Sequence, residues 1–228
     1  MSARKIFQNL MATHFHQPAI CLWRALELLE MKGVTFSAPV LDLGCGNGDV
    51  GEIALRSHWP VFGLDRVHAE VRTAHVRRAY QGLTTSDAIA LPFPDATFGC
   101  VVSICVLEHI PEDTLVLQEI ARVLKPGGCF VFSTPTETFE LNLLRSEDPE
   151  QVNSVNKRLG HYHYRSLAEW KLLLDKEGMS IDCYKLLLPP RSQRVWERLD
   201  NLMISKIRGR RLLDIVRALE RRSLLPKK

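Results

Sequence analysis

Short apolar runs alternate along most of the chain with longer stretches that have helical spacing. A short apolar run is typical of a buried strand, and apolar residues three or four apart indicate one face of a helix. The strands predicted in this way span residues 40–43, 61–64, 83–85, 100–106, 129–133 and 180–188. The predicted helices span residues 18–32, 49–56, 67–80, 114–124 and 166–177. This alternation favours an α/β fold with a doubly wound, mostly parallel sheet and helices on both faces.

Glycine, proline and capping residues mark where several of these elements begin or end. Residues 125–128, Lys-Pro-Gly-Gly, predict a stop and a turn before the strand that follows. Ser166 and Glu169 have the spacing of a capping box at the start of a helix. Residues 135–160 are polar, and we expect a loop or weak helix there.

The pattern divides the chain into three regions. Residues 1–36 are predicted to form an N-terminal helical cap, residues 37–188 the α/β domain, and residues 189–228 a tail of basic amphipathic helices. The tail holds 12 Lys or Arg against 4 Asp or Glu, whereas the rest of the chain holds 18 against 22. We expect the cap and residues 135–164 to cover a pocket at the carboxyl ends of the strands.

Composition narrows the class of protein further. A chain of 228 residues with 46% hydrophobic and 25% charged residues is ordinary globular material. Its six cysteines form no Cys-x-x-Cys pair, which favours buried thiols over disulfides or a zinc site. The sequence contains neither a signal-like segment nor an apolar run of membrane-spanning length. We therefore expect a cytoplasmic protein, able to associate peripherally with a membrane.

A glycine-rich turn follows the first predicted strand and indicates a nucleotide-like ligand. Gly44, Gly46 and Gly48 let the backbone turn tightly and approach a ligand closely. Gly46, Gly48 and Gly51, with Asp65 further on, also match the dinucleotide pattern G-x-G-x-x-G, so an NAD(P)-dependent oxidoreductase is an alternative. The position of Asp42 argues against a pyrophosphate, because a carboxylate there suits a cationic amine instead.

Six segments in order carry a resemblance to a known family. They are DLGCGNG (42–48), Asp65, SDA (86–88), LPFPD (91–95), LEH (107–109) and RVLKPGG (122–128). Over about residues 38–188 the chain resembles the class I S-adenosylmethionine-dependent methyltransferases, in the branch that modifies small molecules, quinones and lipids. The resemblance implies a Rossmann-like fold. One departure is Gly99, where the family usually has an aspartate.

The resemblance also implies a cofactor and the residues that bind it. The cofactor would be S-adenosylmethionine, with S-adenosylhomocysteine as the product. Asp42 would lie near the methionyl amine, Asp65 would accept the ribose hydroxyls, and Asp87 would bind the adenine amino group. The full set of expected cofactor-binding residues is Asp42, Gly44, Cys45, Gly46, Gly48, Asp65, Arg66, Asp87, Ala88 and Leu107.

Two histidines are the candidates for catalysis. Methyl transfer needs a general base only where the nucleophile must lose a proton. His109 follows the fourth predicted strand, and His161 precedes the capping-box helix, where a histidine of similar enzymes often faces the substrate cavity. Ordinary surface or packing roles for these histidines are the alternative. His161 and His163 could suggest a metal, but no carboxylate with suitable spacing accompanies them, so we expect no metal.

The sequence thus predicts transfer of a methyl group to an O, N or C atom of a small-molecule or lipid-like acceptor. A cofactor-binding subunit without catalytic activity is a further alternative. The basic tail suggests a protein partner or an anionic membrane surface. We do not expect nucleic acid, because the residues after the fourth strand lack the Pro-Pro-aromatic motif of enzymes that methylate amino groups of DNA bases.

Overall fold

The computed structural model describes residues 3–13, 17–207 and 210–211. The predicted tail continues to residue 228, and its segment 212–228 lies outside the described residues. The chain forms two compact units, one of residues 31–141 and 145–185 and the other of residues 1–30, 142–144 and 186–228. Among the described residues, no helix combines the length and the apolarity that a membrane crossing requires.

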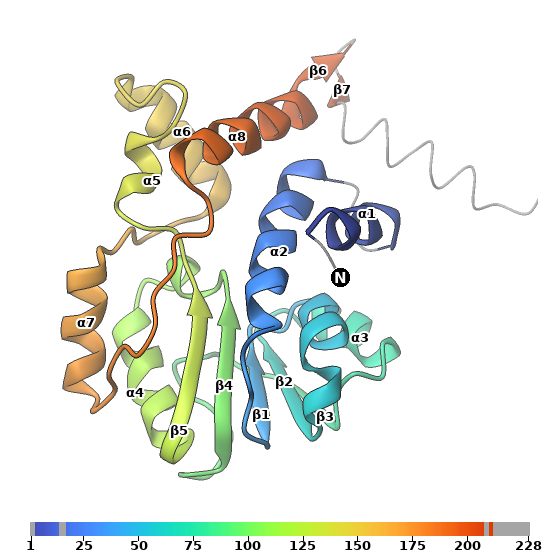
Figure 1. The fold of residues 1–228 in the computed structure, drawn as a ribbon, viewed down its shortest axis with the longest axis vertical. Coiled ribbons are helices and arrows are strands. Elements are labelled where there is room, and N and C mark those ends of the chain that lie inside the picture. Colours follow the sequence, from blue (N-terminus) through green and yellow to red (C-terminus); the bar gives the residue numbers. More distant parts are fainter. Residues whose placement is uncertain (1–2, 14–16, 208–209, 212–228) are drawn as a thin grey trace, which may run out of the picture. The chain divides into compact units, whose positions relative to one another are not determined.

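A five-stranded sheet forms the centre of the larger unit (Figure 1). Its strand order is β3-β2-β1-β4-β5, and every neighbouring pair is parallel. The order reverses between β1 and β4, which is where doubly wound sheets bind their ligands. The strands are β1 (Val40–Leu43), β2 (Val61–Asp65), β3 (Gly82–Thr85), β4 (Phe98–Ile104) and β5 (Leu124–Ser133).

Helices connect these strands and close the core of the larger unit. Val116 and Ile120 of α4 and Trp170 of α7 share one buried cluster with Leu41 of β1 and Val101 of β4. The helices of the larger unit are η1 (Gly51–Leu55), η2 (Arg56–His58), α3 (His68–Val76), η3 (Leu107–His109) and α4 (Asp113–Val123), which lie between strands, and α5 (Thr138–Leu141), α6 (Pro149–Leu159) and α7 (Leu167–Lys176), which follow β5.

The smaller unit is built from helices near the two ends of the chain. The indole rings of Trp23 and Trp196 meet edge to face at 5.4 Å, and the Leu144 N–H donates to the Glu197 carboxylate at 2.6 Å. The cap and tail regions of the sequence therefore share one compact unit. Its elements are α1 (Ala3–Thr13), most of α2 (Pro18–Met31), α8 (Pro190–Ile204) and the short hairpin β6 (Lys206–Ile207) and β7 (Arg210–Arg211).

The structure confirms the predicted fold class, but several elements differ from the predictions. The strand predicted over residues 180–188 is wrong, because that segment forms no strand and leaves Tyr184 and Leu186 exposed. The polar segment 135–160 contains the 11-residue helix α6, which Asp148 caps at its N-terminus and Gly160 ends with a left-handed conformation. The turn predicted over 125–128 is instead an irregularity within β5.

Steric crowding explains why position 99 is a glycine. A Cβ atom added to Gly99 would lie 2.5 Å from the Ser37 carbonyl oxygen. Real Cβ atoms do not approach backbone this closely, so an aspartate at this position would require the preceding segment to move. The departure from the family pattern therefore reflects close packing at the start of β4.

Arg122 ties the end of α4 to the loop before β4. Its guanidinium donates to both oxygens of Glu119 at 2.7 Å, to Asp95 at 2.8 Å, and to the carbonyls of Phe93 and Leu91 at 2.8 and 3.0 Å. The hydrogen bonds from Arg122 lower the pKa of Glu119. One side chain thus satisfies two backbone carbonyls and two carboxylates.

We expect Arg122→Met to lower the free energy of unfolding by about 2 kcal/mol at pH 7, because charged hydrogen bonds are lost. Folding lowers the pKa of Glu119, so this contribution is present above its usual value of 4.5 and is lost as the pH falls through the lowered value. Urea denaturation over a pH series measures both effects. Arg72→Met, at an exposed arginine of α3, is the control. Equal effects of the two substitutions would contradict the prediction.

Candidate functional site

The turn after β1 is held by the end of β2. The backbone N–H groups of Gly44 and Cys45 both donate to the Leu64 carbonyl, at 2.8 and 2.9 Å. The Gly46 N–H donates to the Asp65 carboxylate at 2.9 Å. These bonds fix the turn at the point where the strand order reverses.

The glycines of the turn are required for different reasons. Gly44, Gly46 and Gly48 have φ angles of +75°, +49° and +85°, which L-residues adopt at a cost. A Cβ on Gly44 would lie 2.4 Å from the Val106 side chain, whereas a Cβ on Gly46 would meet nothing within 4 Å. Gly46 therefore borders open space, which a ligand can approach along the backbone.

Asp65 is placed to serve both the turn and a ligand. It ends β2 and is half-buried. One carboxylate oxygen accepts the Gly46 N–H, and the other accepts the Val67 N–H at 2.8 Å. Each carboxylate oxygen has two acceptor positions, so hydroxyl groups of a ligand can still be bound. This arrangement fits a ribose beside the glycine turn.

Asp42 lies beneath the turn and has a partner that the sequence analysis did not identify. Its carboxylate is 2% exposed and accepts the Tyr80 hydroxyl at 2.6 Å. Burial first, and then the charge of Asp42, raise the pKa of Tyr80. Tyr80 also explains Gly51, since a Cβ there would lie 2.1 Å from its hydroxyl, whereas a Cβ on Gly63 would lie 2.6 Å from the Leu83 side chain and 3.0 Å from the Tyr80 ring. Gly51 is thus explained by packing, without a dinucleotide.

The remaining expected cofactor residues lie at the ends of neighbouring strands. Asp87 follows β3, is exposed, and accepts the Ile89 N–H at 3.2 Å, while Ala88 beside it is buried. Leu107, after β4, is fully buried, and Arg66 is exposed. The Cys45 thiol is buried, and burial followed by the charge of Asp42 raises its pKa. Cys45 is therefore a neutral packing residue and not a nucleophile.

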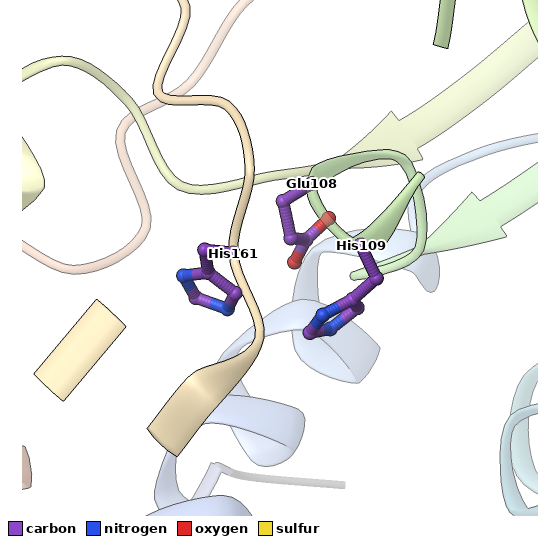
Figure 2. Close-up of side chains that lie close together, drawn as sticks. All are labelled: Glu108, His109 and His161. Atoms are coloured by element: carbon purple, nitrogen blue, oxygen red, sulfur yellow. The ribbon is translucent and has the colours of Figure 1, made fainter. Parts of the chain in front are cut away.

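A second group of polar side chains lies after β4. Glu108 and His109 of η3 converge with His161 (Figure 2). The centroids of the two imidazole rings are 5.0 Å apart. One potential ligand atom of each of the three residues lies within 4.8 Å of the other two. A backbone bond from the Tyr162 N–H to the Glu108 carbonyl, at 2.7 Å, holds the two segments together. We call Glu108, His109 and His161 the Glu-His-His cluster.

A series of hydrogen bonds orients His161. The amide nitrogen of Asn156 donates to Glu140. The amide oxygen of Asn156 is therefore the atom that accepts the Tyr164 hydroxyl, at 2.6 Å. The Tyr164 oxygen then accepts from the His161 Nδ1 at 2.9 Å. Nδ1 therefore carries the proton, and Nε2 keeps a lone pair. Burial, and secondarily the charge of His109, lower the pKa of His161 to about 4, so the ring is neutral at pH 7.

The other two histidines in this region differ from each other. His109 Nδ1 lies 3.0 Å from the Gly160 carbonyl, which can only accept, so Nδ1 is the nitrogen that donates. His163 Nε2 lies 2.9 Å from the Pro111 carbonyl and 3.8 Å from Asp113. The pair His161 and His163 is thus not a joint site. The structure brings the two candidate catalytic histidines, His109 and His161, close together, and the sequence analysis did not identify Glu108 or Tyr164 as their neighbours.

Comparison with known proteins shows similarity to methyltransferases. Residues 41–132 match the family model described as a methyltransferase domain. A relative from Mycolicibacterium smegmatis, named "Probable S-adenosylmethionine-dependent methyltransferase/", is 38% identical over 63% of this chain and 52% of its own length. A ubiquinone biosynthesis O-methyltransferase of Vibrio cholerae is 31% identical over 64% of this chain. This chain covers 62% of that enzyme.

A solved structure shares the fold. The S-adenosylmethionine-dependent methyltransferase of Mesorhizobium loti is 22% identical, with a TM-score of 0.58 over 73% of this chain and 85% of that chain. The five-stranded order, the glycine turn and the matched domain thus agree with the resemblance of the sequence motifs. Residues 41–132 thus match a methyltransferase domain, and the chain is similar to S-adenosylmethionine-dependent methyltransferases.

Proposed function

We propose that this protein transfers a methyl group from S-adenosylmethionine to an O, N or C atom of a small-molecule or lipid-like acceptor. The observation that carries the proposal is the joint arrangement of the glycine turn and Asp65 within the matched domain. S-adenosylmethionine supplies a methyl group on a sulfonium, and its transfer breaks the S–CH₃ bond and leaves S-adenosylhomocysteine.

The residues of the turn fit this cofactor. The open space at Gly46 lets the backbone approach the methionyl part, and the charge of buried Asp42 beneath the turn favours its amine. Asp65 would accept the ribose hydroxyls and exposed Asp87 the adenine amino group. The other proposed contacts are Gly44, Cys45, Gly48, Arg66, Ala88 and Leu107.

In this proposal the Glu-His-His cluster forms the acceptor side of the site, which is the part that contacts the molecule to be methylated. Nδ1 of each ring faces a hydrogen-bond partner, which leaves Nε2 of His109 and of His161 to interact with a hydroxyl group of the methyl acceptor. The rings of Phe139 and Tyr164 stack at 5.3 Å beside His161. This combination of aromatic surface and polar nitrogens suits an acceptor with a ring or lipid-like body and a reacting oxygen. The similarity to ubiquinone O-methyltransferases agrees with it.

S-adenosylhomocysteine should bind the intact protein in a 1:1 ratio, as measured by isothermal titration calorimetry. Asp65→Ala should abolish binding, and Asp65→Asn should weaken it about 10- to 100-fold, because an amide replaces a charged acceptor of hydroxyl groups. Asp182→Asn, at an exposed position, serves as the control. No binding by the intact protein would overturn the proposal, and an NADH fluorescence enhancement would favour the oxidoreductase instead.

Gly46→Ala should weaken S-adenosylhomocysteine binding far more than it lowers stability. The added Cβ enters the open space beside the turn, while its φ strain costs about 1 kcal/mol. Gly127→Ala is the matched control, because Gly127 also has a positive φ of +74° and no atom within 4 Å of an added Cβ. Thermal denaturation and calorimetry of both variants separate the two effects. Equal loss of binding in both variants would contradict the assignment of Gly46.

We propose that the basic end of the tail binds an anionic membrane surface. Residues 206–228 contain nine Lys or Arg and two Asp or Glu, interspersed with apolar residues. Deleting residues 206–228 leaves α8 whole, with its buried Trp196 and Met203.

The truncated protein should lose sedimentation with vesicles that contain phosphatidylserine but keep its affinity for S-adenosylhomocysteine. Binding by the full chain should fall as salt rises, since the attraction is electrostatic. Vesicle binding that is unchanged by the deletion would exclude this role. If the full chain does not bind these vesicles either, binding of a protein partner becomes the better explanation of the basic tail.

A further inference from the structure

Three side chains with metal-binding atoms converge from two segments about fifty residues apart (Figure 2). Glu108 is 1% exposed, His161 is half-buried and His109 is exposed. One carboxylate oxygen and one nitrogen of each ring lie within 4.8 Å of one another. The cluster therefore combines a buried carboxyl group, a half-buried imidazole and an exposed imidazole.

The hydrogen bonds around the cluster are those that a metal site requires. A histidine that binds a metal usually donates its second ring N–H to a carbonyl, carboxylate or similar acceptor, which fixes the ring and its tautomer. Nδ1 of His109 is hydrogen-bonded to the Gly160 carbonyl, and Nδ1 of His161 is hydrogen-bonded to the Tyr164 hydroxyl. Both rings therefore present Nε2 as the nitrogen with a lone pair.

We propose that Glu108, His109 and His161 bind one divalent transition-metal ion of the zinc or manganese class. Two imidazoles and one carboxylate form a donor set that suits Zn²⁺, Mn²⁺ and Fe²⁺ better than Mg²⁺, which prefers oxygen ligands. Ligand atoms around a bound Zn²⁺ lie about 3.3 Å apart, given metal–ligand distances of about 2.0–2.2 Å. Rotation of the exposed His109 side chain is the simplest way to close the remaining gap.

The ion would activate the acceptor hydroxyl in place of direct contacts from the two imidazoles. This role of the ion, but not its binding, rests on the proposed function. Three protein ligands leave coordination positions open, as in catalytic zinc sites. An acceptor hydroxyl that takes one of them has a lower pKa, so its proton passes to solvent and the oxygen becomes the nucleophile. The oxygen then forms the new bond to the methyl carbon as the S–CH₃ bond breaks, and sulfur keeps the electron pair.

The test is metal titration of the full chain after removal of bound ions with a chelator. Zn²⁺ should bind in a 1:1 ratio by calorimetry, and Co²⁺ should give visible absorption of a site with nitrogen and oxygen ligands. His161→Ala and Glu108→Gln should weaken binding by about 100-fold or more, since loss of an outer partner alone costs about 10- to 100-fold. His163→Ala removes an imidazole two residues away that faces Pro111, and it should leave the affinity unchanged.

Tyr164→Phe tests the hydrogen bond that positions His161. The substitution keeps the ring that stacks on Phe139 and removes only the hydroxyl. We expect Zn²⁺ affinity to fall about 10-fold, because His161 loses the acceptor that fixes its tautomer. If Tyr164 served only in packing, Tyr164→Phe would leave the affinity for Zn²⁺ unchanged.

S-adenosylhomocysteine affinity is measured in parallel for every variant. It should be unchanged, which shows that each variant is folded and separates failure of the metal site from failure of the proposed function. If Zn²⁺ binds with the same affinity to His161→Ala, Glu108→Gln and His163→Ala, the ion occupies some other site and the proposal is wrong. Absence of Zn²⁺ and Co²⁺ binding to the intact protein overturns it equally.

Discussion

The hydrogen bond from the Gly46 N–H to the Asp65 carboxylate is the constraint on which the proposed cofactor site depends. It joins the turn after β1 to the end of β2, and it can form only because the two strands pair in parallel with Leu43 opposite Leu64. The Leu64 carbonyl adds two further bonds to the same turn. The turn is therefore ordered when the sheet forms, so a ligand need not supply the free energy to order it.

The acceptor side of the proposed site depends on contacts between distant parts of the sequence. The Tyr162 N–H bond to the Glu108 carbonyl brings the segment after α6 to the end of β4. The left-handed Gly160 ends α6 and also supplies the carbonyl that faces His109. One helix terminus thus contacts His109 and directly precedes His161.

These two kinds of constraint explain what could be predicted from the sequence. The strands β1, β2 and β4 and the glycine turn were predictable, because a short apolar run and a positive φ leave local signals. The segment 180–188 has a similar apolar pattern, but Tyr184 and Leu186 remain exposed, so local pattern gave the wrong strand there.

The partners of the site residues had no local signal. Tyr80 reaches Asp42 across 38 positions, and only the structure shows that Gly51 and Gly63 make room for its ring. Glu108 appeared in a motif, but its place beside His161 follows from the fold of α6, which the polar composition of that segment concealed.

The two sides of the site can therefore change independently. Steric limits at Gly44 and the backbone bonds to Leu64 fix the cofactor side, and few residues satisfy them. The acceptor side depends on the direction of side-chain hydrogen bonds, in which the Glu140 carboxylate, through Asn156 and Tyr164, decides which His161 nitrogen carries a proton. We expect substitutions in that series to change the hydrogen bonding of His161 without disturbing the turn. The sequence motifs therefore point to the cofactor, whereas the proposed acceptor side depends on contacts between residues far apart in the sequence.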